Sequence, residues 1–334
     1  MNKLNENKPI LDIKDLFVRY NTDDAVVHAL NGLNLKIKKG EVRGVVGETG
    51  AGKTTMALSI LGLLPEGIGE ISGGSILFQG NEMVNAKEKI LSEMRGKSIS
   101  MIFQDPMSSL NPVICVGDQI AEVVKLHYPK LTRNEVELKT EEIMEMIGIP
   151  PQRKNEYPYQ FSGGMKQRIV IAIALVCEPD LLIADEPTTA LDVTIQAQIL
   201  ELMKQLKEKM DTSMIFITHD LGVVAEFCDT VSVIYGGEVI ESGTVEQIFA
   251  KDRNHPYTKG LFECIPYMES TSKRLTPILG SMPDPTNLPQ GCSFCDRCAY
   301  AQKRCKNEKP SFYSAGAHEI KCFLYEDAAE VDNE

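Results

Sequence analysis

A glycine-rich segment early in the chain has the residue types and spacing needed to hold phosphate groups. Residues 47–54, GETGAGKT, fit the pattern G-x-x-x-x-G-K-[ST]. Glycines let backbone N–H groups curl around phosphate oxygens, and the N-terminus of the helix expected to follow favours negative charge. Lys53 can reach the β- and γ-phosphates, and the Thr54 hydroxyl can hold Mg²⁺. The residues predicted to surround the phosphates are Gly47, Thr49, Gly50, Ala51, Gly52, Lys53, Thr54 and Thr55.

Two adjacent carboxylates follow an apolar segment further along the chain. Residues 181–184 form a continuous apolar run, as in a buried parallel strand, and Asp185 and Glu186 come directly after it. Asp185 can hold Mg²⁺ through its water shell, and Glu186 can polarise an attacking water. An acidic strand end is common by itself, but its place after the glycine-rich loop favours the catalytic interpretation.

A third motif connects these two. Ser162, Gly163 and Gly164 precede an apolar segment with helical character, and we expect Ser162 to cap that helix. Alone, these residues indicate an ordinary helix start. Lying between the glycine-rich loop and the carboxylate pair, they make the chain resemble the ATP-binding-cassette (ABC) ATPases, in which this signature separates the two nucleotide motifs.

The resemblance implies further site residues and covers about residues 10–245. Gln104 matches the Q-loop glutamine, which contacts Mg²⁺ and the attacking water, and residues 190–192 match the D-loop. His219 matches the switch histidine that contacts the γ-phosphate, and Tyr20 matches the aromatic residue that stacks on adenine. The residues expected to act in catalysis are Glu186, His219, Gln104 and Lys53, and those expected to hold Mg²⁺ are Thr54, Gln104 and Asp185.

A narrower resemblance extends over nearly the whole chain. Residues 103–112, FQDPMSSLNP, look like the Q-loop of oligopeptide, dipeptide and nickel importer ATPases, as do residues 157–158, residues 255–258 and the Gly291-Cys292 tail. It implies an ATPase subunit that couples ATP binding and hydrolysis to uptake of oligopeptides or dipeptides across the cytoplasmic membrane. The implied partners are a second ATPase subunit (this chain or a paralogue), two membrane-spanning permease subunits and, indirectly, an extracytoplasmic peptide-binding protein.

In such an assembly the nucleotide site is shared, because residues 162–164 of one subunit close on the γ-phosphate held by its partner. Two other functions stay open. One is a soluble ABC ATPase of DNA repair or translation, a class that usually has long coiled-coil insertions or two cassettes on one chain. The other is a non-hydrolysing iron–sulfur regulator, and the intact Lys53, Asp185, Glu186 and His219 count against it.

Five of the nine cysteines lie between residues 292 and 322. Four of them, with spacing C-x5-C-x6-C-x16-C, can hold an iron–sulfur cluster or a tetrahedral zinc ion, or can remain bare thiols. The importer resemblance implies a [4Fe–4S] cluster in a structural role, and Cys295 offers competing ligand sets. Because the glycine-rich loop lies outside this tail, we expect ATP binding to survive its disruption. The four expected ligands are Cys292, Cys298, Cys305 and Cys322.

The elements that position these residues alternate between strands and helices, which predicts an α/β fold with a parallel sheet covered on both faces. The resemblance makes this a P-loop ABC ATPase core, with a RecA-like parallel sheet, an antiparallel β subdomain, a helical subdomain and a small Cys-rich C-terminal extension. We expect the nucleotide-binding domain at residues 8–245, its helical subdomain at about 106–165 and the extension at 246–334, with the cysteine cluster at 292–322. Strands are predicted at 10–20, 33–37, 42–46, 75–78, 98–103, 181–184 and 214–218, a hairpin at 231–241, and helices ending near 64 and at 116–126, 165–177 and 194–210, with another capped by Thr132 and Glu135.

Composition limits the partners. The 334 residues have a net charge of −12, which makes non-specific nucleic-acid binding unfavourable, so no nucleic-acid partner is expected. The longest apolar run, residues 169–177, has nine residues, whereas about 20 are needed to span a bilayer. Residues 1–8 are polar and lack the apolar core of a secretory signal. We therefore expect a cytosolic chain that is peripheral at the cytoplasmic face of the cell membrane.

Overall fold

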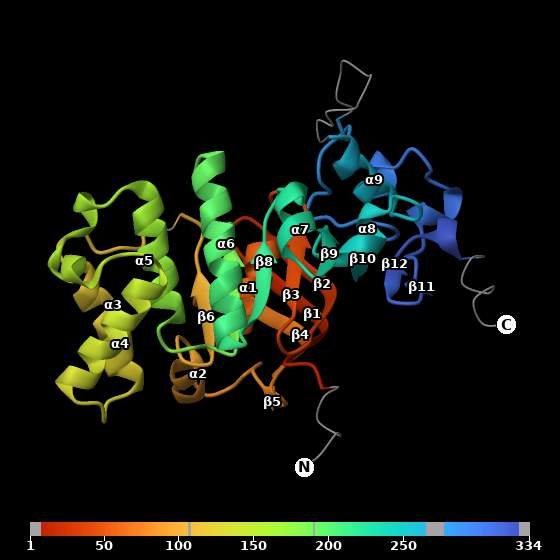
Figure 1. The fold of residues 1–334 in the computed structure, drawn as a ribbon. Coiled ribbons are helices and arrows are strands. Elements are labelled where there is room, and N and C mark those ends of the chain that lie inside the picture. The colour runs from red at the N-terminus through yellow and green to blue at the C-terminus, as the bar shows by residue number, and fades with distance from the viewer. Residues whose placement is uncertain (1–7, 106–107, 190, 265–276, 327–334) are drawn as a thin grey trace, which may run out of the picture. The chain divides into compact units, whose positions relative to one another are not determined.

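The computed structural model describes residues 8–105, 108–189, 191–264 and 277–326 (Figure 1). Its backbone contacts divide the chain into two interleaved units. Unit 1 contains Met1–Ile10, Ile37–Val42 and Asn85–Ile217, and unit 2 contains Leu11–Lys36, Arg43–Val84 and Thr218–Glu334. In the described residues, no helix is both long enough and apolar enough to cross a membrane.

Three parallel strands of unit 1 lie in the order β6 (Ile99–Ile102), β7 (Leu181–Asp185) and β8 (Ser213–Ile217). β7 and β8 are buried along their whole length, which confirms the expectation from their continuous apolar runs. Parallel neighbours need a crossover connection, and the helix α6 (Val193–Met210) supplies it between β7 and β8. The carboxyl ends of β6 and β7 therefore meet at one edge.

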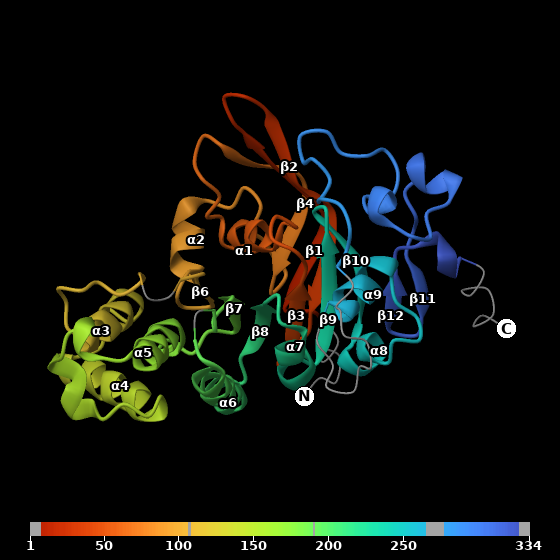
Figure 2. The same cartoon turned by 90° about the horizontal axis from the view of Figure 1, so that it is seen from above.

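The helices α3 (Val116–His127), α4 (Arg133–Met146) and α5 (Gly163–Leu175) of unit 1 contact one another, as Figures 1 and 2 show. The predicted capping box of α4 is confirmed, since Thr132 and Glu135 bond to each other's backbone N–H groups. The shorter elements of unit 1 are α2 (Glu88–Met94) and the 3₁₀ turns η1 (Pro151–Asn155) and η2 (Pro158–Gln160).

An antiparallel sheet in unit 2 has the strand order β2-β1-β4-β5. β1 and β4 pair antiparallel from Leu11↔Phe78 to Tyr20↔Gly69, which carries Tyr20 to the end of this ladder. The strands β2 and β4 extend beyond the short segments predicted for them, because polar and glycine residues there still pair through the backbone. Their bounds are β1 (Leu11–Asn21), β2 (Val26–Ile37), β4 (Gly69–Phe78) and β5 (Asn81–Glu82).

A second group of unit 2 strands has the order β3-β9-β10-β12-β11. β3 (Val42–Val46) runs parallel to β9 (Thr230–Tyr235) and leads into the helix α1 (Lys53–Leu61). β9 and β10 (Glu238–Thr244) form the predicted hairpin, whose turn residues Gly236 and Gly237 have φ values of 56° and 78°. The helix α7 (Leu221–Phe227) precedes β9.

The chain after residue 245 contains more regular structure than its sequence pattern indicated. The helices α8 (Val245–Phe249) and α9 (Pro256–Glu263) are followed by a two-stranded ribbon, β11 (Tyr313–Ala315) and β12 (His318–Ile320), and β12 pairs with β10. Figure 2 shows this part of unit 2 around β10. The described residues of this region also form the 3₁₀ turns η3 (Cys295–Arg297), η4 (Lys303–Lys306) and η5 (Phe323–Tyr325).

Phe294 anchors the cysteine-rich tail in the hydrophobic core of unit 2. It is 4% exposed and shares one core cluster with Val46, Tyr235 and Tyr257, so the tail completes the core next to β3. The proline-rich segment before it forms no helix or strand in its described part, but it contacts β2: the N–H of His28 donates to the carbonyl of Pro285 at 2.8 Å. The tail therefore contributes a core residue and is also held by hydrogen bonds.

Candidate functional site

The glycine-rich loop, hereafter the P-loop (residues 47–55), connects β3 to α1 within unit 2. A Cβ atom on Gly47 would lie 2.3 Å from the carbonyl oxygen of Ile234, so only glycine fits there. Gly52 has a φ of 104° and begins α1. Lys53 is 7% exposed and donates to the carbonyl oxygens of Gly47, at 2.7 Å, and Glu48, at 3.0 Å. Two carbonyl groups at the start of the loop therefore accept hydrogen bonds from the lysine at its end.

Tyr20 lies beside the P-loop, as the adenine-stacking prediction requires. Its hydroxyl donates to the Thr55 hydroxyl at 3.1 Å, and its ring is half-buried. β1 and α1 both belong to unit 2, so this contact brings together two segments that are far apart in the sequence. The partly exposed Tyr20 side chain therefore lies next to the first turn of α1.

The carboxylate pair lies at the end of β7 in unit 1. Asp185 is 1% exposed, and Glu186 has a φ of 50°, a left-handed conformation that is costly for glutamate and typical of functional positions. The Glu186 N–H donates to the carbonyl of Ile217 at 2.9 Å, and Thr189 Oγ1 donates to Glu186 Oε2 at 2.9 Å. These bonds hold the Glu186 carboxylate in one orientation.

Gln104 follows β6, the parallel neighbour of β7. Ile102 pairs with Ala184, so Gln104 and the carboxylate pair leave neighbouring strands at the same edge of unit 1. Gln104 is exposed there. Two Q-loop residues, Pro106 and Met107, lie outside the described residues.

The signature residues lie at the start of α5, also in unit 1. Ser162 occupies the N-cap position of α5, as expected, and is exposed, but its side chain makes no capping hydrogen bond. A Cβ on Gly164 would lie 2.7 Å from Ile195 Cγ2, so glycine allows α5 and α6 to pack closely. Gln167 Nε2 donates to the carbonyl of Pro187 at 2.6 Å, which ties α5 to the segment after the carboxylate pair. Gly163 is half-buried.

The remaining predicted residues lie at helix starts or outside the described chain. His219 is exposed and directly precedes Asp220, whose carboxylate accepts from the N–H of Gly222 at 2.9 Å and so caps α7 in unit 2. Ala190 of the D-loop lies outside the described residues, and Asp192 caps α6 by accepting from Ile195 N at 3.0 Å. The structure therefore groups the P-loop with Tyr20, and Gln104 with the carboxylate pair.

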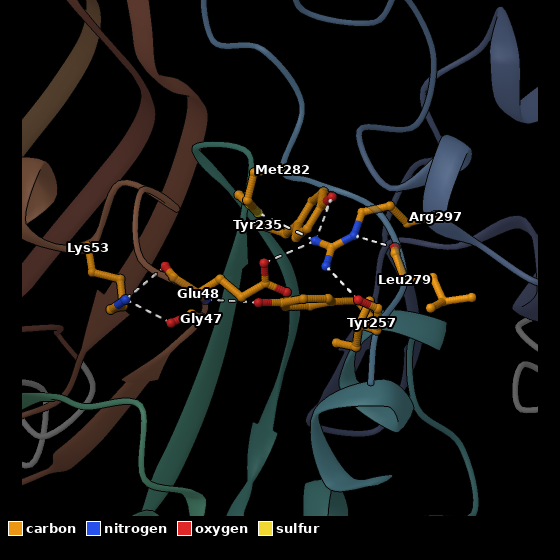
Figure 3. Close-up of polar contacts among 9 residues, drawn as sticks. Gly47, Glu48, Lys53, Tyr235, Tyr257, Leu279, Met282 and Arg297 are labelled. Atoms are coloured by element: carbon orange, nitrogen blue, oxygen red, sulfur yellow. Dashed lines mark hydrogen bonds and ion pairs between the residues drawn. The ribbon is translucent and has the colours of Figure 1, made fainter. Parts of the chain in front are cut away.

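Sequence reasoning missed two residues of the extension that contact the P-loop (Figure 3). The Glu48 N–H donates to the Tyr257 hydroxyl at 2.9 Å, and Arg297 Nη1 donates to Glu48 Oε2 at 3.0 Å. Burial raises the pKa of Tyr257 and keeps its hydroxyl protonated. The only signal in the sequence is that residues 255–258 belong to a recognised motif, which says nothing about the partner they contact.

All five clustered cysteines line one cavity within unit 2, together with His255, Phe294 and Phe323 among others. Burial raises the pKa of Cys292 to about 12 and that of Cys322 to about 11, and the thiols of Cys298 and Cys305 add to both shifts. All nine cysteines are free thiols. In the described part of the chain, no three metal-binding side chains are arranged around a point that could hold one ion. The cavity wall consists of Cys292, Cys295, Cys298, Cys305 and Cys322 with apolar and aromatic neighbours.

Comparison with known protein families places two matches on the chain. The family described as "ABC transporter" matches residues 30–189, and the family described as "Oligopeptide/dipeptide transporter, C-terminal region" matches residues 240–305. Among solved structures, the dimeric post-hydrolysis ATP-binding cassette MJ0796 bound to ADP and Pi has a TM-score of 0.63 and 27% identity, covering 70% of this chain and 98% of that one. CbiO1 from Clostridium perfringens, part of the ABC transporter complex cbiONQ, has a TM-score of 0.63 and 32% identity, covering 73% and 92%.

Curated relatives match nearly the whole chain. The oligopeptide transport ATP-binding protein OppD of Bacillus subtilis (strain 168) is 48% identical over 97% of this chain and 91% of its own length. The dipeptide transport ATP-binding protein DppD of the same organism is 45% identical over 96% of both chains. With this similarity added to a P-loop, a carboxylate pair and a signature helix, the chain belongs to the ABC transporter ATPases, in the group formed by the ATP-binding proteins of oligopeptide and dipeptide transporters.

Proposed function

We propose that this chain is the ATP-hydrolysing subunit of an importer that couples ATP binding and hydrolysis to uptake of oligopeptides or dipeptides. One observation carries the proposal: the chain resembles peptide-transporter ATPases over nearly its full length, including the C-terminal region matched at residues 240–305. It would lie at the cytoplasmic face of the cell membrane as a peripheral protein. Two membrane-spanning permease subunits would hold it there, and an extracytoplasmic binding protein would deliver the peptide.

The P-loop would hold the phosphates of ATP in this proposal. The loop leads into α1, and the dipole at the N-terminus of this helix favours anions. Lys53, buried against the carbonyls of Gly47 and Glu48, would transfer its hydrogen bonds to the β- and γ-phosphates. Tyr20 would stack on adenine, and Thr49, Gly50, Ala51, Gly52 and Thr55 would complete the cradle.

Hydrolysis would use the residues at the ends of β6 and β7. Thr54, Gln104 and Asp185 would hold Mg²⁺, which supplies charge stabilisation at the transferred phosphoryl group. Glu186 would act as general base toward the attacking water, and its fixed orientation by Thr189 supports that role. His219 would contact the γ-phosphate.

Two copies of the cassette would share each site. Residues 162–164 of one subunit would close on the γ-phosphate bound by its partner, because Ser162 is exposed and its hydroxyl is not used to cap α5. Dimeric assemblies of a similar ATP-binding cassette support this arrangement. The helical subdomain, about residues 106–165 of a nucleotide-binding domain at 8–245, would pass the closing motion to the permease.

The cysteine-lined cavity of the extension, residues 246–334, would hold a [4Fe–4S] cluster. Its donor set would suit a cluster, since Cys292, Cys298, Cys305 and Cys322 line one cavity among apolar side chains. A bound cluster would supply iron–thiolate crosslinks between segments that are distant in sequence. Stoichiometric zinc without iron or sulfide, after anaerobic purification, would overturn this part of the proposal.

The decisive test of the transport function is native purification of the complex from membranes, with identification of every subunit. We expect two polytopic permease subunits to copurify, and deletion of the chain to abolish uptake of labelled di- or oligopeptides by whole cells. Copurification with DNA-repair or ribosomal proteins in place of membrane subunits would refute the proposal.

A further inference from the structure

Arg297 links the cysteine-rich extension to the P-loop (Figure 3). Its side chain is only 6% exposed and lies on η3, in the part of the extension that lines the cysteine cavity. The guanidinium donates to Glu48 Oε2 at 3.0 Å, to the Leu279 carbonyl at 3.0 Å and to the Tyr235 hydroxyl at 3.3 Å. Leu279 and Tyr235 therefore fix the direction in which Arg297 points, and that direction is toward Glu48.

Glu48 has four hydrogen-bond partners. Its N–H donates to the Tyr257 hydroxyl at 2.9 Å, its carbonyl accepts from Lys53 Nζ at 3.0 Å and from the Ala51 N–H at 3.1 Å, and its carboxylate accepts from Arg297. Two of these four partners, Tyr257 and Arg297, come from the extension. The orientation of the Glu48 peptide, which begins the phosphate cradle, consequently depends on residues more than 200 positions away.

The Lys53 contact is the one that nucleotide must break. A P-loop lysine binds the β- and γ-phosphates, so Lys53 has to leave the carbonyls of Gly47 and Glu48 when ATP arrives. Glu48 then keeps its hydrogen bonds with Ala51, Tyr257 and Arg297, and the last two of these residues belong to the extension. A charge-assisted pair that is largely buried on the arginine side is well suited to keep the loop in place, because charged hydrogen bonds are about twice as strong as neutral ones.

We propose that Arg297 is a positioning residue for the P-loop: through Glu48 it keeps the loop in its nucleotide-binding shape, so that ATP affinity depends on the C-terminal extension. The role concerns ATP binding, which the chain shares with all ABC ATPases. It does not depend on the identity of the transported substrate.

Calorimetric titration of the full-length protein with Mg²⁺ and a non-hydrolysable ATP analogue tests the proposal. The variants are Arg297→Met, Glu48→Gln and the double variant. We expect each single variant to bind about tenfold more weakly, because either one removes the same charged hydrogen bond. The double variant should be no weaker than the weaker single variant, because the two changes break one interaction. The binding stoichiometry measures the fraction of folded protein separately. A change in affinity therefore reflects a change in the P-loop of the folded protein.

A matched control is Arg304→Met. Arg304 forms its recorded hydrogen bonds with Gln302, Phe323 and Glu326, all within the extension. It should bind the analogue with wild-type affinity. Weaker binding by this control, to the same degree as Arg297→Met, would overturn the proposal in favour of general loosening of the extension.

Arg297→Lys and Glu48→Gln keep the test decisive if Arg297→Met fails to fold. Lysine keeps the charge but cannot supply the forked donors of arginine, so we expect partial recovery, about threefold weaker than wild type. In the variants that bind more weakly, hydrogen exchange of the backbone amides at residues 49–53 should be faster than in the wild type. Folded Arg297→Lys and Glu48→Gln proteins that bind within twofold of wild type, or single effects that multiply in the double variant, would overturn the proposal.

Discussion

The P-loop and the cysteine cavity both belong to unit 2, but they are assembled in different ways. The P-loop is one continuous segment whose shape comes from a strand, a run of glycines and the first turn of α1. The cavity is lined by residues from several segments that lie apart in the sequence, including the start of α9 and the turns η3, η4 and η5. The carboxylate pair of unit 1 resembles the P-loop in this respect, because it is also one short segment at a strand end.

This difference predicts how each region responds to a single substitution. A continuous motif keeps its residues adjacent whatever happens elsewhere, so single substitutions in it should change chemistry or affinity more than folding. A cavity built from dispersed segments depends on every segment, so loss of one ligand should disturb the others. Arg297 connects the two regions, because it belongs to η3 beside Cys298 and bonds to Glu48 of the P-loop.

The largest expected effect separates chemistry from binding in the nucleotide region. Glu186→Gln keeps the size of the side chain and removes its charge, so ATP should still bind while hydrolysis falls by about 10² or more. Phosphate release by the purified transporter and a separate nucleotide-binding assay measure the two quantities. Glu226→Gln, an exposed glutamate on α7, is the control and should hydrolyse normally. Near-normal hydrolysis by Glu186→Gln would remove the glutamate from the proposed role of base.

Ser162→Arg tests whether a continuous motif can serve a site on another subunit. The added bulk and charge should lower hydrolysis by the assembled transporter by about tenfold or more, since the partner's γ-phosphate would lose its donor. ATP affinity of the isolated chain should change little. If the isolated chain hydrolyses ATP at the rate of the whole transporter, the shared site is wrong.

Tyr20→Ala tests whether the Tyr20 ring on β1, which lies beside Thr55 of the P-loop, contributes to ATP binding. Loss of base stacking should weaken ATP binding by about tenfold, and Tyr20→Phe, which keeps the ring and loses only the bond to Thr55, should bind close to wild type. GTP should compete with ATP for the wild-type site, because stacking on an aromatic ring distinguishes bases only weakly. This competition tests whether Tyr20 holds the base by stacking. Equal losses in the two variants would show that the hydroxyl, rather than the ring, matters.

The smallest effect on ATP should come from the cysteine cavity. If the proposed cluster is present, Cys305→Ser should lose its iron and lower the thermal midpoint by about 5 °C, whereas Cys295→Ser should keep the iron if Cys295 is a bystander. Contrary to the expectation from sequence, we predict that ATP affinity also falls, by about threefold, because η3 carries Arg297. Iron and sulfide analysis, thermal unfolding and calorimetry check the three parts. Iron retained after Cys305→Ser would contradict the ligand set.

Local motifs made much of the fold and site predictable. The apolar runs at 181–184 and 214–218, the capping box at Thr132 and the Gly236-Gly237 turn each depend on residues within a few positions, so the sequence determined them. The P-loop, with φ values above zero at Gly50 and Gly52, is another such case. The order of the P-loop, the signature residues 162–164 and the carboxylate pair along the chain was enough to identify the family.

Tertiary structure alone decided the contacts between distant residues. Arg297 and Glu48 are 249 positions apart, and no periodicity or spacing connects them. Likewise, only packing shows that Phe294 joins the core beside β3, that Cys295 lines the cavity, and that the Ser162 hydroxyl does not cap α5. The physical reason is that burial and long-range hydrogen bonds depend on which segments meet in space, and one-dimensional patterns record only near neighbours.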